Sequence, residues 1–244
     1  MDYRILSLDE PNSQIAEIYR LIRTNIEYST LDSNNKVINI TSTTSGEAKS
    51  TTSANLAVMC ANKLNRVLLI DLDLRSPSIH KLFKIKNNVG VTNLLLDYVD
   101  KGDAVDIFKY AKKIDHDNIN NELYVITTGH EIANPTEVLG SNKLRGLINH
   151  LQTQFDQVII DSSPSGVIPD GLVTSTLTSG TIYVVESGRT KIEQARQTID
   201  KLRSMNVNLL GVILTKVKGA GGTYGQYYGY GEIDSSKSKR IKID

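Results

Sequence analysis

A stretch of small residues around one lysine carries the clearest chemical signal in the sequence. Residues 37–40 form a short β-branched run, residues 41–46 are Thr, Ser and Gly, and a helix is expected from Lys49. A junction of this kind binds phosphate, because free backbone N–H groups and the positive end of the helix dipole converge there. Lys49 can reach the outer phosphates of a nucleotide, and the Ser50 hydroxyl can ligate Mg²⁺.

The stretch matches the phosphate-loop pattern G-x-x-x-x-G-K-[ST] only in part. Thr43 stands at the first glycine position and Ala48 at the second, which leaves the pair Lys49–Ser50 intact. A lysine–serine pair that opens a helix is also common at solvated surface turns, so acidic partners elsewhere must decide between the two interpretations. Glycine at position 48 would allow a positive φ without steric cost, and we expect a left-handed backbone there even with alanine.

Three aspartates lie at the ends of apolar strands. Residues 66–75 contain an apolar run that ends in Asp71 and Asp73, and residues 157–161 end in Asp161. Side chains alternate along a strand, so Asp71 and Asp73 share a face at the carboxyl edge of a parallel sheet, where ligands bind. A polar strand end that turns into solvent is the alternative, but the strand–helix–strand spacing favours a nucleotide site. Asp161 then has the position of a Walker B aspartate at the magnesium end of that site.

A charged array follows one side of an expected helix at residues 12–28. Isoleucines recur there at helical spacing behind Ser13, a candidate N-cap. Glu17, Arg20 and Arg23 lie on the polar side of this helix. The simplest interpretation is a solvated face with one ion pair, which stabilises a helix by about 0.2–0.5 kcal/mol.

The last 26 residues differ in composition from the rest of the chain. Residues 219–244 offer almost no aliphatic side chains to bury, so we expect a flexible tail. A glycine-rich tail cannot bury tyrosine rings, yet hydroxyls on a flexible tether are suitable phosphoacceptors, because the tether holds them near a neighbouring active site. The clustered tyrosines of this tail are Tyr224, Tyr227, Tyr228 and Tyr230.

The composition excludes several classes of function. The 28 Lys and Arg residues nearly balance the 27 Asp and Glu residues, so no global field indicates a nucleic acid or an anionic membrane as partner. The single cysteine, Cys60, excludes a disulfide within the chain and fits the cytoplasm. No apolar run approaches about 18 residues, so we expect a soluble chain. The four histidines show no zinc-ligand spacing.

Expected strands and helices alternate along the first 218 residues. Thr190 and Glu193 form a capping box at the start of the last helix. This alternation requires right-handed crossovers and predicts an α/β fold with a doubly wound, mostly parallel sheet. The further elements are strands at residues 123–127, 181–185 and 209–214, and helices at residues 90–98, 134–151 and 190–205.

The motifs and their order along the chain resemble those of the bacterial tyrosine kinases of capsular and exopolysaccharide biosynthesis. The resemblance is to the cytoplasmic form without a fused membrane segment. The likeness covers nearly the whole chain and implies the P-loop NTPase fold of the deviant Walker A (MinD/ParA-like) type. It implies a kinase domain at residues 1–218, with an oligomerisation helix at about residues 13–28, and an autophosphorylation tail at residues 219–244. The matching segments are the array at Glu17, Arg20 and Arg23, Walker A at residues 41–51, Walker A′ with Asp71, Asp73 and Arg75, residues 134–137, Walker B at Asp161, and the tyrosine cluster.

The resemblance implies transfer of the γ-phosphoryl group of ATP, with Mg²⁺, to the tail tyrosines of an adjacent subunit in a homo-oligomeric ring. It also implies a transmembrane adaptor of the polysaccharide chain-length type, which activates the kinase and recruits it to the inner face of the plasma membrane. Together with a cognate tyrosine phosphatase, this phosphorylation would regulate polymerisation and export of the polysaccharide.

The resemblance also assigns roles to single residues. Lys49 and the loop amides hold the β- and γ-phosphates, because phosphoryl transfer depends on positioning and charge neutralisation. Ser50, Asp73 and Asp161 hold Mg²⁺ directly or through water, and Asp71 orients and accepts the tyrosyl proton. The residues expected at the nucleotide are Thr44, Ser45, Gly46, Glu47, Ala48, Lys49, Ser50, Thr51 and Lys216.

The chain departs from the family pattern at several positions. Ser45 replaces a proline, Ala48 replaces the second glycine, and residues 162–163 are Ser-Ser where Thr-Pro is usual. Thr215 precedes Lys216 where the family often has an asparagine that reads adenine. These changes bear on catalytic strength and nucleotide choice rather than on the fold.

Two other functions remain open at this stage. A positioning ATPase of the MinD/ParA type would carry a signature lysine early in the loop, where this chain has Thr44. A catalytically weak, nucleotide-dependent scaffold on the membrane adaptor is the second, and Ala48 is the residue that favours it.

Overall fold

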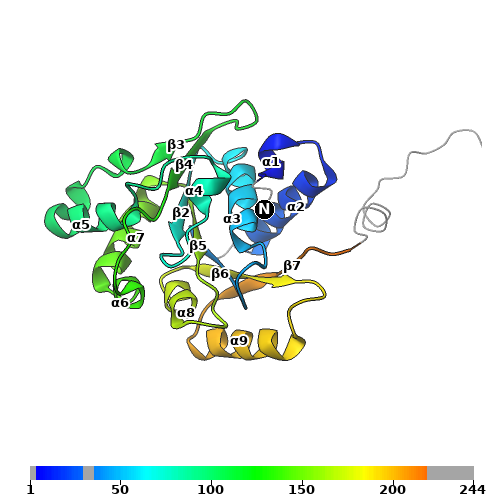
Figure 1. Cartoon of the computed structure of the whole chain (residues 1–244). Coiled ribbons are helices and arrows are strands. Elements are labelled where there is room, and N and C mark those ends of the chain that lie inside the picture. The colour runs from blue at the N-terminus through cyan, green and yellow to red at the C-terminus, as the bar shows by residue number, and fades with distance from the viewer. Residues whose placement is uncertain (1–3, 30–35, 219–244) are drawn as a thin grey trace, which may run out of the picture.

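A seven-stranded sheet forms the centre of the molecule in the computed structural model, which describes residues 4–29 and 36–218 (Figure 1). The strand order is β3-β4-β2-β5-β1-β6-β7, and all neighbouring strands are parallel except β3 and β4. The strands are β1 (Val37–Ser42), β2 (Arg66–Leu72), β3 (Lys112–Lys113), β4 (Glu122–Ile126), β5 (Gln157–Ser162), β6 (Gly180–Glu186) and β7 (Leu209–Thr215).

Alternate residues of the central strands enter two separate hydrophobic cores. In β1, Ile38 and Ile40 pack into one core, and Val37 packs into the other. In β2, Leu69 belongs to the first core and Leu68 to the second. This alternation follows from the period of two along a strand. The central strands are buried on both faces, which confirms the predicted doubly wound α/β fold, whereas Val212 and Leu214 of the edge strand β7 are more than half exposed.

Helices cover both faces of the sheet. The first face carries α1 (Leu6–Asp9), α2 (Gln14–Ser29), α3 (Lys49–Ala61) and α4 (Ile79–Leu82). The second face carries α5 (Val91–Lys101), α6 (Pro135–Leu139), α7 (Asn142–Gln154) and α8 (Pro169–Ser175), while α9 (Ile192–Ser204) lies along β6 and β7 (Figure 1). Two short 3₁₀ helices, η1 (Gly102–Ala104) and η2 (Ile107–Lys109), follow α5.

Two local predictions are wrong. The helix expected at residues 134–151 is divided into α6 and α7, because Ser141 acts as a new N-cap and its hydroxyl accepts the N–H of Leu144 at 3.1 Å. The capping box of Thr190 and Glu193 does not form, since α9 begins one residue later, after Lys191. The Thr190 hydroxyl instead accepts the N–H of Glu186 and donates to a carboxylate in the loop after β1.

Other expectations about elements hold in the described residues. The Ser13 hydroxyl accepts the N–H of Ala16 at the start of α2, as an N-cap does. The short α1 and β3 were not among the expected elements. No helix within residues 4–29 and 36–218 is long and apolar enough to cross a membrane. The tail at residues 219–244, with its tyrosine cluster, lies outside the described residues.

Candidate functional site

The loop between β1 and α3 has the backbone shape of a phosphate-binding loop. Gly46 has a φ of 83°, and Ala48 has a φ of 65° and a ψ of 23°. Both residues are therefore left-handed, as expected for Ala48. An alanine in this conformation costs roughly 1–2 kcal/mol relative to the right-handed form. Lys49 begins α3, so the free N–H groups of the first helical turn lie next to the loop.

Lys49 connects this loop with the ends of two strands. Its Nζ lies 3.2 Å from Asp161 Oδ1, 3.4 Å from Asp73 Oδ2 and 3.4 Å from the Ser50 hydroxyl oxygen. Burial lowers the pKa of Lys49, but the charges of Asp161, Asp73 and Asp71 outweigh it and hold this pKa above its ordinary value. The ammonium group is therefore charged at neutral pH, as a phosphate-binding lysine must be.

The three predicted aspartates come together at the carboxyl ends of β2 and β5. The strand register places Asp71 opposite Asp161, and both are fully buried. Asp71 accepts hydrogen bonds of 3.1 Å from the backbone N–H groups of Asp73, Ser78 and Ile79. Burial, helped by the charge of Asp161, raises the pKa of Asp71 to about 8. Burial is also the main cause of the raised pKa of Asp161.

The side chains of Ser50, Asp73 and Asp161 fit a magnesium ion. Asp161 Oδ2 is buried and has no hydrogen-bond partner among the described residues, so this oxygen is open to a cation. Magnesium is usually held by one or two carboxylates together with waters and phosphate oxygens. In the described part of the chain, no group of three or more His, Cys, Asp and Glu side chains could hold a metal by itself. A magnesium ion here would therefore depend on the nucleotide.

Glu47 is bound inside the loop. Its carboxylate is fully buried and accepts the N–H groups of Thr43 at 2.7 Å and Thr44 at 2.9 Å, together with the Thr190 hydroxyl. Glu47 was expected among the nucleotide-binding residues. In the structure its side chain holds the loop together and connects it to the start of α9.

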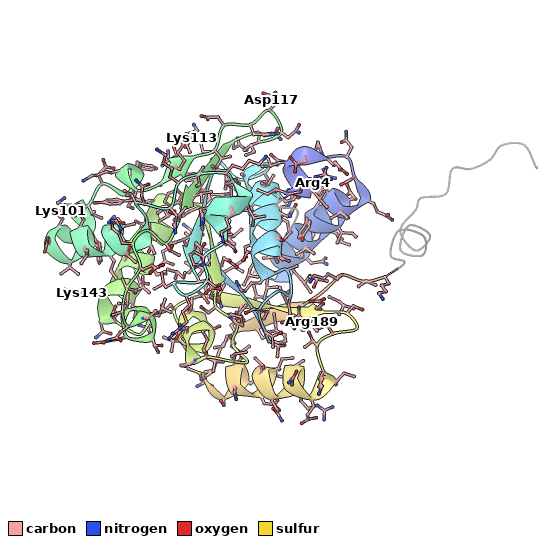
Figure 2. The ribbon with its side chains drawn as sticks, in the orientation of Figure 1. Arg4, Lys101, Lys113, Asp117, Lys143 and Arg189 are labelled. Atoms are coloured by element: carbon pink, nitrogen blue, oxygen red, sulfur yellow. The ribbon has the colours of Figure 1, made fainter. Side chains whose placement is uncertain are left out.

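Two cations lie over the outer side of the loop. Lys216 Nζ donates to the Gly46 carbonyl at 2.7 Å and contacts Glu186 at 3.0 Å. Arg189, between β6 and α9 (Figure 2), also contacts Glu186 at 3.0 Å. A hydrogen bond from Lys216 lowers the pKa of Glu186. The Thr215 hydroxyl donates to the Glu47 carbonyl at 2.9 Å, so the end of β7 is fixed to the loop.

Arg75 joins the Walker A′ segment to two helices. Its Nε lies 2.6 Å from Asp170 Oδ2 in α8, and its Nη2 lies 3.0 Å from the Thr136 hydroxyl in α6. Thr136 also donates to Asp170 at 2.5 Å. The Asn134–Glu137 segment, which the sequence analysis singled out, is thus held next to the aspartates through Arg75.

The charged array on α2 is divided between two environments. Arg20 forms an ion pair with Glu17 on the exposed side of the helix. Arg23 turns toward α3 instead, where its Nη1 lies 3.4 Å from the Met59 carbonyl. The role of the array in oligomerisation stays a prediction.

Sequence reasoning missed several polar residues that support the site. Ser53, one turn into α3, donates to Asp161 at 3.0 Å, and Ser163 donates to Asp73 at 2.8 Å. Asp170 accepts a hydrogen bond from Arg75, and Thr190 donates one to Glu47. Ser53 could have been found, because it lies four residues after Lys49 on the same helix face. The others come from distant segments, and no local pattern predicts their contacts.

Comparison with known proteins identifies the family. Residues 38–229 match the CobQ/CobB/MinD/ParA nucleotide binding domain. The tyrosine-protein kinase YwqD of Bacillus subtilis (strain 168) is 37% identical over 239 residues, which cover 98% of this chain and 96% of YwqD. The chain belongs to the bacterial tyrosine kinase family.

Solved structures support the same assignment. The crystal structure of the chimerical protein CapA2B2 superimposes with a TM-score of 0.77 at 31% identity and covers 86% of this chain and 88% of that one. The kinase domain of the Escherichia coli tyrosine kinase ETK gives a TM-score of 0.76 at 27% identity, with 86% and 79% covered. This bacterial tyrosine kinase thus has the P-loop NTPase fold predicted from its sequence, and its aspartates and lysine lie together at the carboxyl edge of the sheet.

Proposed function

We propose that the chain is an ATP-dependent protein-tyrosine kinase that phosphorylates the tail tyrosines of a neighbouring subunit and thereby regulates capsular or exopolysaccharide polymerisation and export. The observation that carries this proposal is the cluster at the carboxyl edge of the sheet, where Lys49 Nζ lies 3.4 Å from Asp73 and 3.2 Å from Asp161. Such a cluster suits phosphoryl transfer, which needs positioning and charge neutralisation.

The nucleotide would be held by the loop between β1 and α3. Lys49 exchanges its carboxylate contacts for the β- and γ-phosphates, while the N–H groups at the start of α3 bind the same oxygens. Ser50, Asp73 and Asp161 are the residues that would hold magnesium. The bound ion would supply charge neutralisation for the developing negative charge on the phosphates.

Asp71 is the proposed proton acceptor. As the tyrosyl oxygen forms its bond to the γ-phosphorus, the bond between that phosphorus and the β–γ bridging oxygen breaks, and ADP leaves. The tyrosyl proton passes to Asp71. An ordinary aspartate with a pKa near 4 is a weak base for a phenol near 10, and a pKa of about 8 brings Asp71 closer to its partner. Asp71 accepts the proton only in its ionised form, which is the minor form at neutral pH, so the rate of phosphoryl transfer should rise with pH up to about 8.

The proposed partners follow from membership of the family. They are a transmembrane polysaccharide chain-length adaptor, further copies of the chain in a ring, and a cognate tyrosine phosphatase. The balanced charge of the sequence supports a local protein contact rather than nucleic acid as the mode of recognition. Recruitment to the inner face of the plasma membrane would then depend on the adaptor.

A catalytically weak scaffold is a second candidate, and the left-handed alanine at position 48 favours it. Strain in the phosphate loop opposes tight binding of the nucleotide, and a scaffold would tolerate this better than a fast enzyme. Both candidates use the same nucleotide site and adaptor. They differ in whether phosphotyrosine is formed.

The Lys49→Met variant tests the kinase proposal. It keeps the length of the side chain and removes its charge, so we expect at least about 100-fold less phosphotyrosine when protein, ATP, Mg²⁺ and the adaptor segment are combined. Lys101→Met is the matched control, since Lys101 lies on α5 in an exposed ion pair with Asp97. Undiminished labelling of the Lys49 variant would contradict the proposal. No labelling of the wild-type protein, with ATP bound, would favour the scaffold.

The tail is tested separately from the catalyst. Changing Tyr224, Tyr227, Tyr228 and Tyr230 together to Phe should remove most self-labelling while an added tyrosine substrate is still phosphorylated. Strong self-labelling of this variant would show that the main acceptor lies elsewhere.

A further inference from the structure

A basic groove lies at the β4 edge of the sheet, away from β7. It has a volume of about 420 Å³ and runs between the connection from α4 to α5 and the short strand β3. Figure 1 shows β3 and β4 on the opposite side of the molecule from β7. The lysine rim of the groove consists of Lys84, Lys86 and Lys112. Its apolar floor consists of Ile85, Val89 and Tyr110.

The charges of the lysine rim are not neutralised by ion pairs. Among the described residues, the lysines that form ion pairs are Lys49, Lys63, Lys101, Lys113 and Lys216. Lys84, Lys86 and Lys112 are absent from this set. A fourth cation, Lys109, has its Nζ 5.4 Å from the centre of the Tyr110 ring. Three lysines that form no ion pair within the described residues therefore line one concave site, and Lys109 lies beside its Tyr110 ring.

Three acidic groups around the Tyr110 and Lys113 side chains already have partners. Glu122 pairs with Lys113 and Arg66, each at 2.9 Å. Asp97 pairs with Lys101 at 2.7 Å and also accepts the hydroxyl of Tyr110. Asp106 is nearby too, and its carboxylate accepts a backbone N–H in η2. The field in the groove is therefore positive and unbalanced.

The apolar lining of the groove is partly exposed and partly buried, because Val89 is 43% exposed while Tyr110 and Val125 are buried. Tyr110 is 8% exposed, and its hydroxyl is bound to Asp97, so the ring contributes carbon surface rather than a polar group. Val125 of β4 is almost fully buried beneath it. The volume lies within the range of roughly 300–1,000 Å³ that is typical of small-ligand sites. A suitable ligand thus combines an apolar body with a concentrated negative charge.

We propose that this groove binds phosphotyrosine from the tail of a second copy of the chain. Phosphotyrosine combines an aromatic ring with a phosphate of charge about −1.5 to −2 at neutral pH, which matches the apolar floor and the lysine rim. The concave shape favours a single inserted side chain over a flat anionic membrane. The inference depends on the proposed kinase function only for the source of the phosphotyrosine, which Tyr224, Tyr227, Tyr228 and Tyr230 would provide.

Chain length keeps Tyr224 of the same chain from the groove. Five strand-to-strand steps separate β4 from β7, which is roughly 24 Å along the sheet. Six residues lead from Lys218 to Tyr224, and they span roughly 20 Å at most. The reach of Tyr224 is therefore too short for the groove of its own chain, whereas a neighbouring copy can supply any tyrosine of the cluster. Binding in the groove would hold a phosphorylated tail away from the phosphate loop of its neighbour.

Binding of a synthetic peptide tests this inference without any kinase activity. The probe is a fluorescent peptide of residues 221–232 phosphorylated at Tyr228, titrated against phosphatase-treated full-length protein without ATP. We expect saturable binding by anisotropy, at least tenfold tighter than that of the unphosphorylated peptide. The double variant Lys86→Gln, Lys112→Gln should weaken binding at least tenfold. The matched control is Lys143→Gln, Lys201→Gln, which changes an exposed lysine on α7 (Lys143, Figure 2) and one on α9, and it should change binding less than twofold.

Several outcomes would overturn the assignment. Equal affinity for the two peptides would show that phosphate is not recognised, and equal loss in both double variants would show that only net charge matters. No peptide binding, together with groove-dependent binding to phosphatidylglycerol vesicles, would identify a membrane contact instead. If the wild-type protein forms no phosphotyrosine but still binds the phosphopeptide, the proposed kinase function is wrong and the binding role of the groove stands.

Discussion

At the scale of single residues, Ala48 shows how far this phosphate loop departs from a glycine loop. Its φ of 65° requires a conformation that glycine adopts freely and alanine adopts at a cost of roughly 1–2 kcal/mol. Glu47, the residue before it, holds the loop from inside through the N–H groups of Thr43 and Thr44. These contacts determine the loop geometry strongly enough to keep alanine in a left-handed conformation.

Ala48→Gly should therefore improve nucleotide binding. If the strain opposes the productive loop, its release tightens ATP binding up to about tenfold, because about 1.4 kcal/mol corresponds to one decade. Calorimetric titration of ATP into both proteins measures the change. Asn206→Gly is the matched control, because Asn206 also has a positive φ of 56° but lies outside the loop. Unchanged or weaker binding in the Ala48 variant would show that alanine is accommodated without loss.

The buried aspartate pair predicts an unusual pH dependence of stability. Asp71 has a pKa of about 8 in the folded protein, against 3.8 in the unfolded chain. Between these values the folded state binds more protons than the unfolded state, so the free energy of unfolding falls as pH rises. From pH 6 to pH 8 we expect a loss of about 2 kcal/mol, or about 5 °C in Tm.

Asp71→Asn should reduce this dependence, because asparagine resembles the protonated acid and does not titrate. Thermal unfolding of both proteins at pH 6, 7 and 8 tests the prediction. The charged groups that face Asp71 are Asp161, Lys49 and Asp73, and all three residues are kept in the variant, although Asp161 loses a carboxyl neighbour. Identical slopes for the two proteins would assign the titration to another group.

At the scale of elements, the break between α6 and α7 depends on a single cap. Ser141→Ala removes the hydroxyl that accepts the N–H of Leu144, which should cost about 1 kcal/mol and lower Tm by about 2–4 °C. Ser204→Ala is the control, because its hydroxyl binds a carbonyl at the exposed end of α9. Equal Tm values for the wild type and the Ser141 variant would show that packing, and not the cap, separates the two helices.

The same break shows what could be predicted from the sequence. Long periodic elements such as α2, β2 and β5 follow from local patterns, and so does the convergence of Asp71, Asp73 and Asp161 at one edge. Interactions over long distances in the chain could not be predicted. Thr190 fits a capping box by its spacing, yet a contact with Glu47, 143 residues away, takes its hydroxyl. The two-residue β3 exists only because β4 offers it a partner.

At the scale of the whole molecule, the two exposed regions away from the nucleotide edge have different consequences for assembly. The basic groove beside β4 is suited to a charged ligand, whereas α2 presents the Glu17–Arg20 pair on its exposed side. The third member of the array, Arg23, packs against the last turn of α3, where a cation is favoured by the helix dipole. The array is therefore divided between a surface and a packing role.

This division predicts different results for the two parts of the array. Glu17→Ala with Arg20→Ala removes an exposed ion pair that stabilises the helix by about 0.2–0.5 kcal/mol, so the Tm should stay the same. If these charges contact a neighbouring subunit, the assembly should shift toward monomer. Arg23→Ala should instead lower Tm by about 2–4 °C, because it removes the contact with Met59. Light scattering at matched concentration, with nucleotide and adaptor, measures the mass, and thermal unfolding measures the stability. An unchanged mass for the double variant would make the Glu17–Arg20 pair an ordinary solvated surface pair.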